Sequence, residues 1–285
     1  MMISLILATL GRRQEVKNFL DKLLQQSYMK YELIIVDQNM DDRVRHICLN
    51  YKNKLDIKYI HTNEKGLSHA RNIGLQYAKG KIIAFPDDDC WYDPNTLKLV
   101  NDLLSDETVD GVCGCPIDRN HQPLIHNFLD KKTFLDKKNV WHGGISFTIF
   151  LRNTVVKSVG NFDERLGVGS STVYGSGEET DYLLRAIENR FKLLYTPQLN
   201  VFHPRKDSTL KIDDCVRARK YGMGMGAVLK KHDYSCCYFM KVLIRPLGGA
   251  LLALFSFNKL LAQYRLNTFI GRALGWIYVK NEDKE

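Results

Sequence analysis

The chain has 285 residues, of which 45% are hydrophobic, so it can form one large domain or one domain with an appendage. Its seven cysteines include no repeated C-x-x-C pair, which argues against a zinc site and a disulfide framework and favours a reduced, cytoplasmic setting. The net charge of +9 is uneven: residues 209–285 hold 13 Lys and Arg against 6 Asp and Glu, and the first 208 residues hold 28 against 26.

Apolar strands alternate with helices through the N-terminal half. The first residues are apolar and the basic ones follow, which is the reverse of a signal peptide, so residues 2–9 predict a strand. Further strands are expected over 31–37, 57–62 and 82–85, and helices over 13–26 and 67–78. Strands and helices that alternate at this spacing indicate a parallel α/β sheet.

The second half contains fewer strands and ends in helices. Strands are expected over 110–116, where Cys113 and Cys115 would be buried thiols, and over 145–151. A helix follows Gly177 and ends near Asn189, and residues 192–197 and 200–204 are expected as short strands or turns. Beyond Thr209 the pattern is helical almost to the end. We therefore expect a catalytic-type domain over 1–208 and a basic, apolar helical region over 209–285.

Polar residues end three of the predicted N-terminal strands. Thr9, Asp37 and the triplet Asp87–Asp88–Asp89 each follow an apolar run, and strand ends of an open α/β sheet share one edge, where such sheets place their ligands. Oxygen ligands at that edge suit a hard cation such as Mg²⁺ or Mn²⁺. The alternatives are that the triplet is an acidic loop capping the helix that starts near Pro94, and that Asp37 forms a turn or caps a helix.

Five segments, in order, resemble family 2 glycosyltransferases. They are "ILATLGR", "LIIVDQNMDD", "NEKGLSHARNIGL", "IIAFPDDDCW" and "VGNFDERLGVGSSTVYGSGEETDYLLRA", and together they cover about residues 2–205. The resemblance implies the GT-A fold: α/β, with a Rossmann-like mixed sheet flanked by helices, here with a C-terminal helical extension. It also implies an inverting, metal-dependent transfer from a nucleotide-diphosphate sugar, UDP being the commonest nucleotide, to a saccharide acceptor.

The resemblance assigns a nucleotide-sugar site and a metal site. The first would contain Thr9, Arg12, Asp37, Asn63, Gly66, Arg71, Asp87 and Asp88. Asp87, Asp89 and His203 would hold Mn²⁺ or Mg²⁺ against the diphosphate. The guanidinium of Arg71 suits phosphate oxygens, although a helix-surface salt bridge is the alternative for it. A structural histidine is the alternative for His203.

The acidic start of the helix after Gly177 is the expected source of the catalytic base. An inverting transfer needs a carboxylate that takes the proton of the acceptor hydroxyl. Family members have Glu-Asp here, with the second residue as base; this chain has Glu178 and Glu179, so Glu179 is expected as base, with Glu178 and Asp181 as further candidates. The alternative is that these acids only favour the helix macrodipole.

The acceptor side is expected near Trp141, His142 and Gly143, where an aromatic ring could stack on a sugar; a core tryptophan is the alternative. The segment "YGMGMG" (221–226) follows no strand, so a dinucleotide site is not favoured. We expect instead a small-residue helix face that either packs closely or lies at the membrane.

The basic, apolar tail favours the inner face of the plasma membrane and a lipid-linked acceptor, as in capsule or O-antigen synthesis. A helical cap and a dimer interface remain alternatives for the tail, a homo-oligomer is left open, and nucleic acid is not expected as a partner. Two other functions stay open: a sugar-phosphate nucleotidyltransferase, and a non-catalytic membrane partner subunit.

Overall fold

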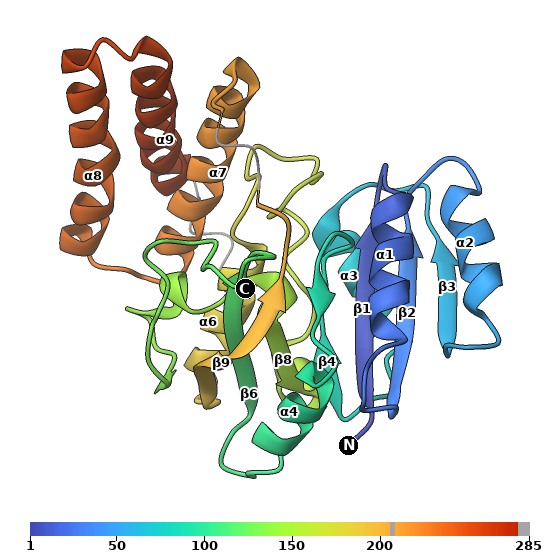
Figure 1. Ribbon diagram of the computed structural model, residues 1–285. Helices are drawn as coiled ribbons and strands as arrows, with labels where there is room; N and C mark the ends of the chain where they lie inside the picture. The colour runs from blue at the N-terminus through green and yellow to red at the C-terminus, as the bar shows by residue number, and fades with distance from the viewer. Residues whose placement is uncertain (206–208, 279–285) are drawn as a thin grey trace. The chain divides into compact units, whose positions relative to one another are not determined.

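The computed structural model describes residues 1–205 and 209–278 (Figure 1). Its strands are β1 Ile3–Thr9, β2 Tyr31–Asp37, β3 Ile57–His61, β4 Ile82–Ala84, β5 Trp91–Tyr92, β6 Gly111–Ile117, β7 Thr133–Phe134, β8 Ile149–Arg152 and β9 Leu193–Phe202. Its α-helices are α1 Gln14–Leu23, α2 Arg43–Tyr51, α3 Leu67–Leu75, α4 Thr96–Leu103, α5 Asn153–Val159, α6 Glu178–Glu188, α7 Ile212–Lys231, α8 Cys236–Phe255 and α9 Lys259–Tyr278.

The chain forms two compact units that alternate along the sequence. The sheet unit comprises residues 1–65, 69–162 and 182–205, and the helical unit comprises, among the described residues, 66–68, 163–181 and 209–278. The expected boundary after residue 208 stays a prediction.

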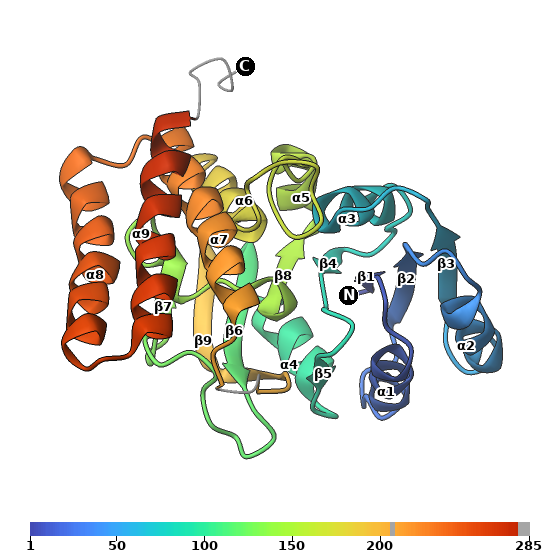
Figure 2. The same ribbon diagram turned by 90° about the horizontal axis from the view of Figure 1, so that it is seen from above.

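All strands of the sheet unit join one mixed sheet, in the order β3-β2-β1-β4-β8-β6-β9-β5, with β7 pairing with β9. β1 is parallel to β2 and β4, whereas β8 is antiparallel to β4 and β6. Figure 2 shows α1, α2 and α4 on one face of the sheet and α3 and α5 on the other. Because both faces are covered, all seven residues of β1, of β2 and of β6 are buried. The mixed α/β sheet flanked by helices confirms the expected fold class.

The expected strands of the second half differ from the structure in two respects. Residues 192–197 and 200–204, expected as separate strands or turns, contribute to one long strand, β9, because it pairs in parallel with β6. The strand expected over 145–151 begins at Ile149, since residues Ser146–Thr148 form a 3₁₀ turn. Cys113 and Cys115 are buried in β6 as expected, and burial raises the pKa of Cys113 to about 12.

In the helical unit α7, α8 and α9 lie side by side, with α9 in the middle (Figures 1 and 2). Glycines allow α7 and α9 to approach closely. A Cβ at Gly226 of α7 would lie 2.2 Å from the carbonyl oxygen of Arg272, and one at Gly275 of α9 would lie 2.1 Å from that of Met223. Gly224 of α7 faces the loop before α6, where a Cβ would lie 2.1 Å from the carbonyl oxygen of Ser176. The glycines of "YGMGMG" therefore form a closely packed small-residue face, the first of the two settings expected for it.

Candidate active site

The polar strand ends of the sheet unit meet at one edge. Thr9 lies opposite Asp37 in the β1–β2 register, and Asp87 forms a parallel bridge with Ala8. The hydroxyl of Thr9 donates a 2.7 Å hydrogen bond to Asp88. The fold thus brings a hydroxyl, a lone carboxylate and the acidic triplet together at the carboxyl ends of parallel strands, where α/β sheets bind ligands.

The triplet concentrates negative charge in a partly buried place. Burial, together with the charge of Asp89, raises the pKa of Asp88 to about 7, against the opposing hydrogen bond from Thr9. Carboxylates this close resist ionisation together, so a cation that neutralises them is favoured at this edge.

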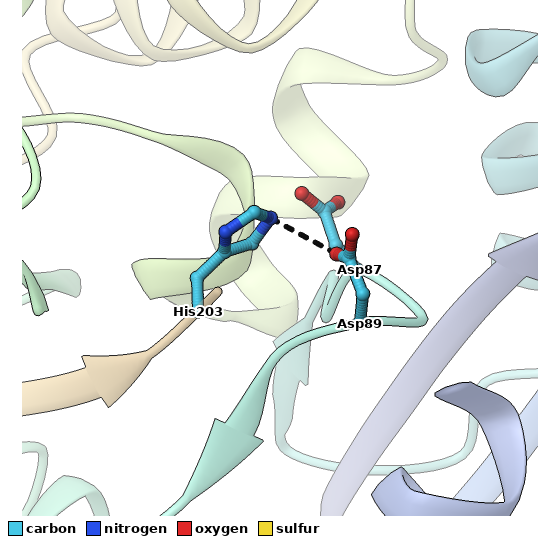
Figure 3. A group of neighbouring side chains, drawn as sticks. All are labelled: Asp87, Asp89 and His203. Atoms are coloured by element: carbon cyan, nitrogen blue, oxygen red, sulfur yellow. Dashed lines mark ion pairs between the residues drawn. The ribbon is translucent and has the colours of Figure 1, made fainter. Parts of the chain in front are cut away.

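Asp87, Asp89 and His203 converge at the same place (Figure 3). One ligand atom from each lies within 4.8 Å of the others, and His203 Nε2 is 2.9 Å from Asp89 Oδ1. His203 Nδ1 lies 2.8 Å from the carbonyl oxygen of Pro204, and since a carbonyl only accepts, Nδ1 carries a proton and Nε2 is the ring atom turned to the carboxylates. Two carboxylates and an oriented imidazole fit a divalent ion such as Mn²⁺.

The ion pair between Asp89 and His203 shifts both groups. Burial alone would raise the pKa of Asp89, but the hydrogen bond and charge of His203, together with Arg12, hold it below its usual value. Burial alone would lower the pKa of His203, and the same partner raises it. The ring also stacks on Phe147 at a centroid distance of 5.0 Å, which fixes its plane.

Asp37 is fully buried and well supplied with donors. The backbone N–H and the side-chain amide of Asn39 donate to one of its oxygens, at 2.9 and 2.7 Å, and the hydroxyl of Tyr59 donates to the other at 2.9 Å. The hydrogen bond from the Asn39 N–H is the interaction expected if Asp37 serves to form a turn. Burial, and then the hydrogen bond to Asp37, raises the pKa of Tyr59, so this hydroxyl remains a donor. Neither Asn39 nor Tyr59 was among the expected site residues.

Two arginines contact the triplet differently. Arg71 is 1% exposed; its guanidinium lies 3.3 Å from Asp87 and 5.5 Å from the ring centre of Phe162. The alternative of a helix-surface salt bridge is therefore wrong for Arg71. Arg12 is 43% exposed at its side chain and lies 3.3 Å from Asp89 and 2.9 Å from Glu15, so it borders the site on its open side.

The segment that begins at Asn63 passes from one unit to the other. Asn63 is exposed in the sheet unit, whereas Gly66 belongs to the helical unit and has a φ of +142°, a conformation that favours glycine.

The acidic start of α6 belongs to the helical unit. Glu178 is buried, with its carboxyl group beside Gly167, Glu179 is half-buried, and both lie in the first helical turn, where the macrodipole favours negative charge. Asp181 is fully buried and accepts hydrogen bonds from Lys231 at 2.8 Å and from His232 at 2.9 Å. The end of α7 thus holds the first turn of α6.

The expected acceptor residues form a short turn in the sheet unit. Trp141 and His142 are half-buried at the end of a 3₁₀ helix. Gly143 is buried, and a Cβ there would lie 2.6 Å from Leu135 and 2.7 Å from Leu129. Close packing alone therefore explains the glycine.

A cavity of about 740 Å³ adjoins Asp89 in the sheet unit, and sequence reasoning did not find it. Its lining combines α1 with the segment after the triplet, the end of β9 and Arg119. Trp91 stacks on Phe202 there at 5.4 Å, and the guanidinium of Arg119 lies 5.4 Å above the Trp91 ring. The position of Trp91, two residues after the triplet, is the signal that could have indicated this cavity.

Known proteins of similar sequence carry out sugar transfer. WfgD of Escherichia coli, named as a UDP-Glc:alpha-D-GlcNAc-diphosphoundecaprenol beta-1,3-glucosyltransferase, is 26% identical over 158 residues, which are 54% of this chain and 62% of WfgD. The match therefore spans less than two thirds of that relative's length, and less still of several other curated relatives.

Two of the solved structures that match the chain illustrate the shared fold. Staphylococcus aureus TarS 1–349 in complex with UDP-GlcNAc matches with a TM-score of 0.62 at 15% identity, over 94% of this chain and 90% of that one. The Pyrobaculum calidifontis mannosyltransferase PcManGT, with GDP-Man and Mn²⁺, matches with a TM-score of 0.63 at 14% identity, over 99% and 88%. The model of the family "Glycosyl transferase family 2" matches residues 4–153, more than half of the chain. The chain belongs to glycosyl transferase family 2 and has its GT-A fold.

Proposed function

We propose that this protein is an inverting, metal-dependent glycosyltransferase that moves a sugar from a nucleotide-diphosphate sugar, UDP first among the candidates, to a saccharide acceptor. The convergence of Asp87, Asp89 and His203 at the polar strand ends carries the proposal. Membership of the family favours transfer over the nucleotidyltransferase alternative.

Each strand end has a role in donor binding. Asp37, oriented by Asn39 and Tyr59, accepts a hydrogen bond from the base or the ribose. Asp88 beside Thr9 contacts the ribose or the donor sugar. A divalent ion held by Asp87, Asp89 and His203 would neutralise the diphosphate as it leaves. The structure of TarS contains UDP-GlcNAc, and that of PcManGT contains GDP-Man and Mn²⁺. These bound molecules support a nucleotide-diphosphate sugar as the class of ligand.

Glu179 is the proposed base, with Glu178 as the reserve. Its carboxylate takes the proton of the acceptor hydroxyl while that oxygen bonds to the anomeric carbon. The bond from the anomeric carbon to the diphosphate oxygen breaks, the electron pair leaves with the diphosphate, and attack from the opposite side inverts the anomeric centre. The buried Asp181, held by Lys231 and His232, positions the helix that carries the base.

A lipid-linked saccharide is the proposed acceptor, in synthesis of a surface polysaccharide such as capsule or O-antigen at the inner face of the plasma membrane. The diphosphoundecaprenol acceptor in the name of WfgD supports this class. We expect faster transfer to a sugar on a polyprenyl diphosphate than to the same sugar free in solution.

Calorimetry with UDP, dTDP, GDP and CDP tests the donor site, first with Mn²⁺ and then with EDTA. We expect one nucleotide to bind only with the metal, and an Asp89→Asn variant to lose that binding. If no nucleotide binds with Mn²⁺ present, the metal site is wrong, and the non-catalytic partner subunit becomes the better interpretation.

A further inference from the structure

The helix α8 exposes a continuous apolar stripe. Met240, Ile244, Leu247, Leu251 and Leu254 follow one another at alternating spacings of four and three, so they lie on one side of the helix, and their exposed fractions range from 38% to 61%. The buried residues of α8 each precede a member of this stripe and face another direction, toward α9. An apolar surface of this length marks an interaction site.

The apolar surface continues past the end of α8. Leu252 is 71% exposed, Phe255 81% and Phe257, in the turn before α9, 92%. These side chains lie at the end of the α8–α9 pair, which Figure 1 shows as an antiparallel hairpin. Moving rings this exposed from water to an apolar boundary lowers the free energy, because it removes apolar surface from water.

The charge around this surface has one sign. From Tyr234 to Asn281 the sequence contains no Asp or Glu. Lys241 and Arg245 follow the stripe residues 240 and 244 by one position, so they flank it, and Lys259 and Arg265 are exposed on α9. A second copy placed on this face by a two-fold axis would set cations against cations, so the charge opposes self-association and favours an anionic partner.

The occupant that combines an apolar boundary with negative charge is an anionic lipid bilayer. α8 is the one helix among the described residues that is long and apolar enough to cross a membrane, by length and composition. Arg245 occupies its middle, however, and a spanning α8 would place that guanidinium near the bilayer centre, which is costly. If α8 lies in the plane of the surface instead, Lys241 and Arg245 reach the headgroups while the stripe enters the acyl region.

We propose that the surface formed by Met240, Ile244, Leu247, Leu251, Leu252, Leu254, Phe255 and Phe257, with Lys241 and Arg245 at its border, docks in the plane of an anionic membrane. This inference deepens the proposed function, because it supplies the surface on which a lipid-linked acceptor would be met. Binding to lipid and binding of nucleotide are separate measurements, so either can fail without the other.

Flotation of the full-length protein tests the proposal, with vesicles of phosphatidylglycerol and phosphatidylethanolamine compared with neutral phosphatidylcholine vesicles. We expect binding to the anionic vesicles that weakens with salt. Burial of one phenylalanine side chain in the bilayer raises the partition coefficient of the protein roughly tenfold. Phe255→Ser with Phe257→Ser should therefore weaken vesicle binding about a hundredfold. At roughly fivefold per cation, Lys241→Gln with Arg245→Gln should weaken it about 25-fold on anionic vesicles only.

Matched controls lie elsewhere on the chain. Ile212→Ser with Val216→Ser removes two apolar side chains of α7 that are 71% and 58% exposed, and Lys52→Gln with Lys54→Gln removes two exposed cations. Both control pairs should bind vesicles as the wild type does, and all variants should keep nucleotide binding.

Several outcomes would overturn the proposal. They are absence of vesicle binding by the wild type, equal binding to neutral vesicles, and equal losses in the control pairs. Resistance to extraction from membranes by alkaline carbonate would show that α8 spans the bilayer. A dimer that dissociates on replacement of Phe255 and Phe257, seen by analytical ultracentrifugation, would show that the surface meets a second copy.

Discussion

Replacing Lys231 by methionine would remove the cation that lies between two carboxylates of the helical unit. Its Nζ is 2.8 Å from Asp163 and 2.8 Å from Asp181, whose side chains are 13% and 0% exposed. Loss of one partner of a buried ion pair costs about 3–5 kcal/mol. In the variant Asp163 would still pair with Arg165 and Asp181 with His232, and the Lys231 side chain is 20% exposed. We therefore expect a loss of unfolding free energy at the low end of this range, about 3 kcal/mol.

Urea unfolding monitored by circular dichroism measures this loss, and the same variant tests the positioning role. Donor binding should be unchanged, because its expected residues other than Gly66 lie in the sheet unit. By contrast kcat should fall, and KM for the donor should stay constant. Lys231→Arg should restore part of both stability and kcat. Combined with Asp181→Asn, Lys231→Met should cost less than the sum of the two single changes. Wild-type stability and kcat in the Lys231→Met variant would refute the role of this ion pair.

Gly226→Ala should lower the free energy of unfolding by about 1–3 kcal/mol, because its Cβ would meet the Arg272 oxygen. Gly248→Ala is the matched control, because Gly248 in α8 has open space around it. Equal thermal midpoints for the two variants would contradict the close crossing of α7 and α9. Glu179→Gln should abolish measurable transfer while nucleotide binding stays intact, and unchanged transfer would exclude Glu179 as base. Although burial alone would raise the pKa of Asp163, hydrogen bonds from Arg165 and Lys231 hold it well below its usual value. Its ion pairs therefore stabilise the fold above about pH 4 and are lost as pH falls further, so wild-type stability should drop more steeply between about pH 5 and 2 than that of Asp163→Asn, and parallel curves would exclude the effect.

Much of the sheet unit follows from local sequence. Continuous apolar runs such as residues 3–9 and 31–37 predict strands that are buried on both faces, and the structure confirms them. The triplet that follows β4 after two residues predicts acidic groups at a strand end, because the strand direction fixes which end carries them. The glycines of residues 221–226 predict a small-residue helix face that packs closely or lies at a membrane, and the structure shows the close packing, because glycine leaves room for a neighbouring backbone.

Tertiary structure decided which of these groups meet. His203 reaches Asp89 because β9 pairs with β6 and β5 across the sheet, a contact between residues 114 positions apart that no local pattern contains. The burial of Arg71, and of Asp181 against Lys231 and His232, likewise depends on packing between distant segments. A sequence specifies the chemistry of each side chain, whereas burial and the identity of its neighbours, which set its charge and its role, arise only when the chain is packed.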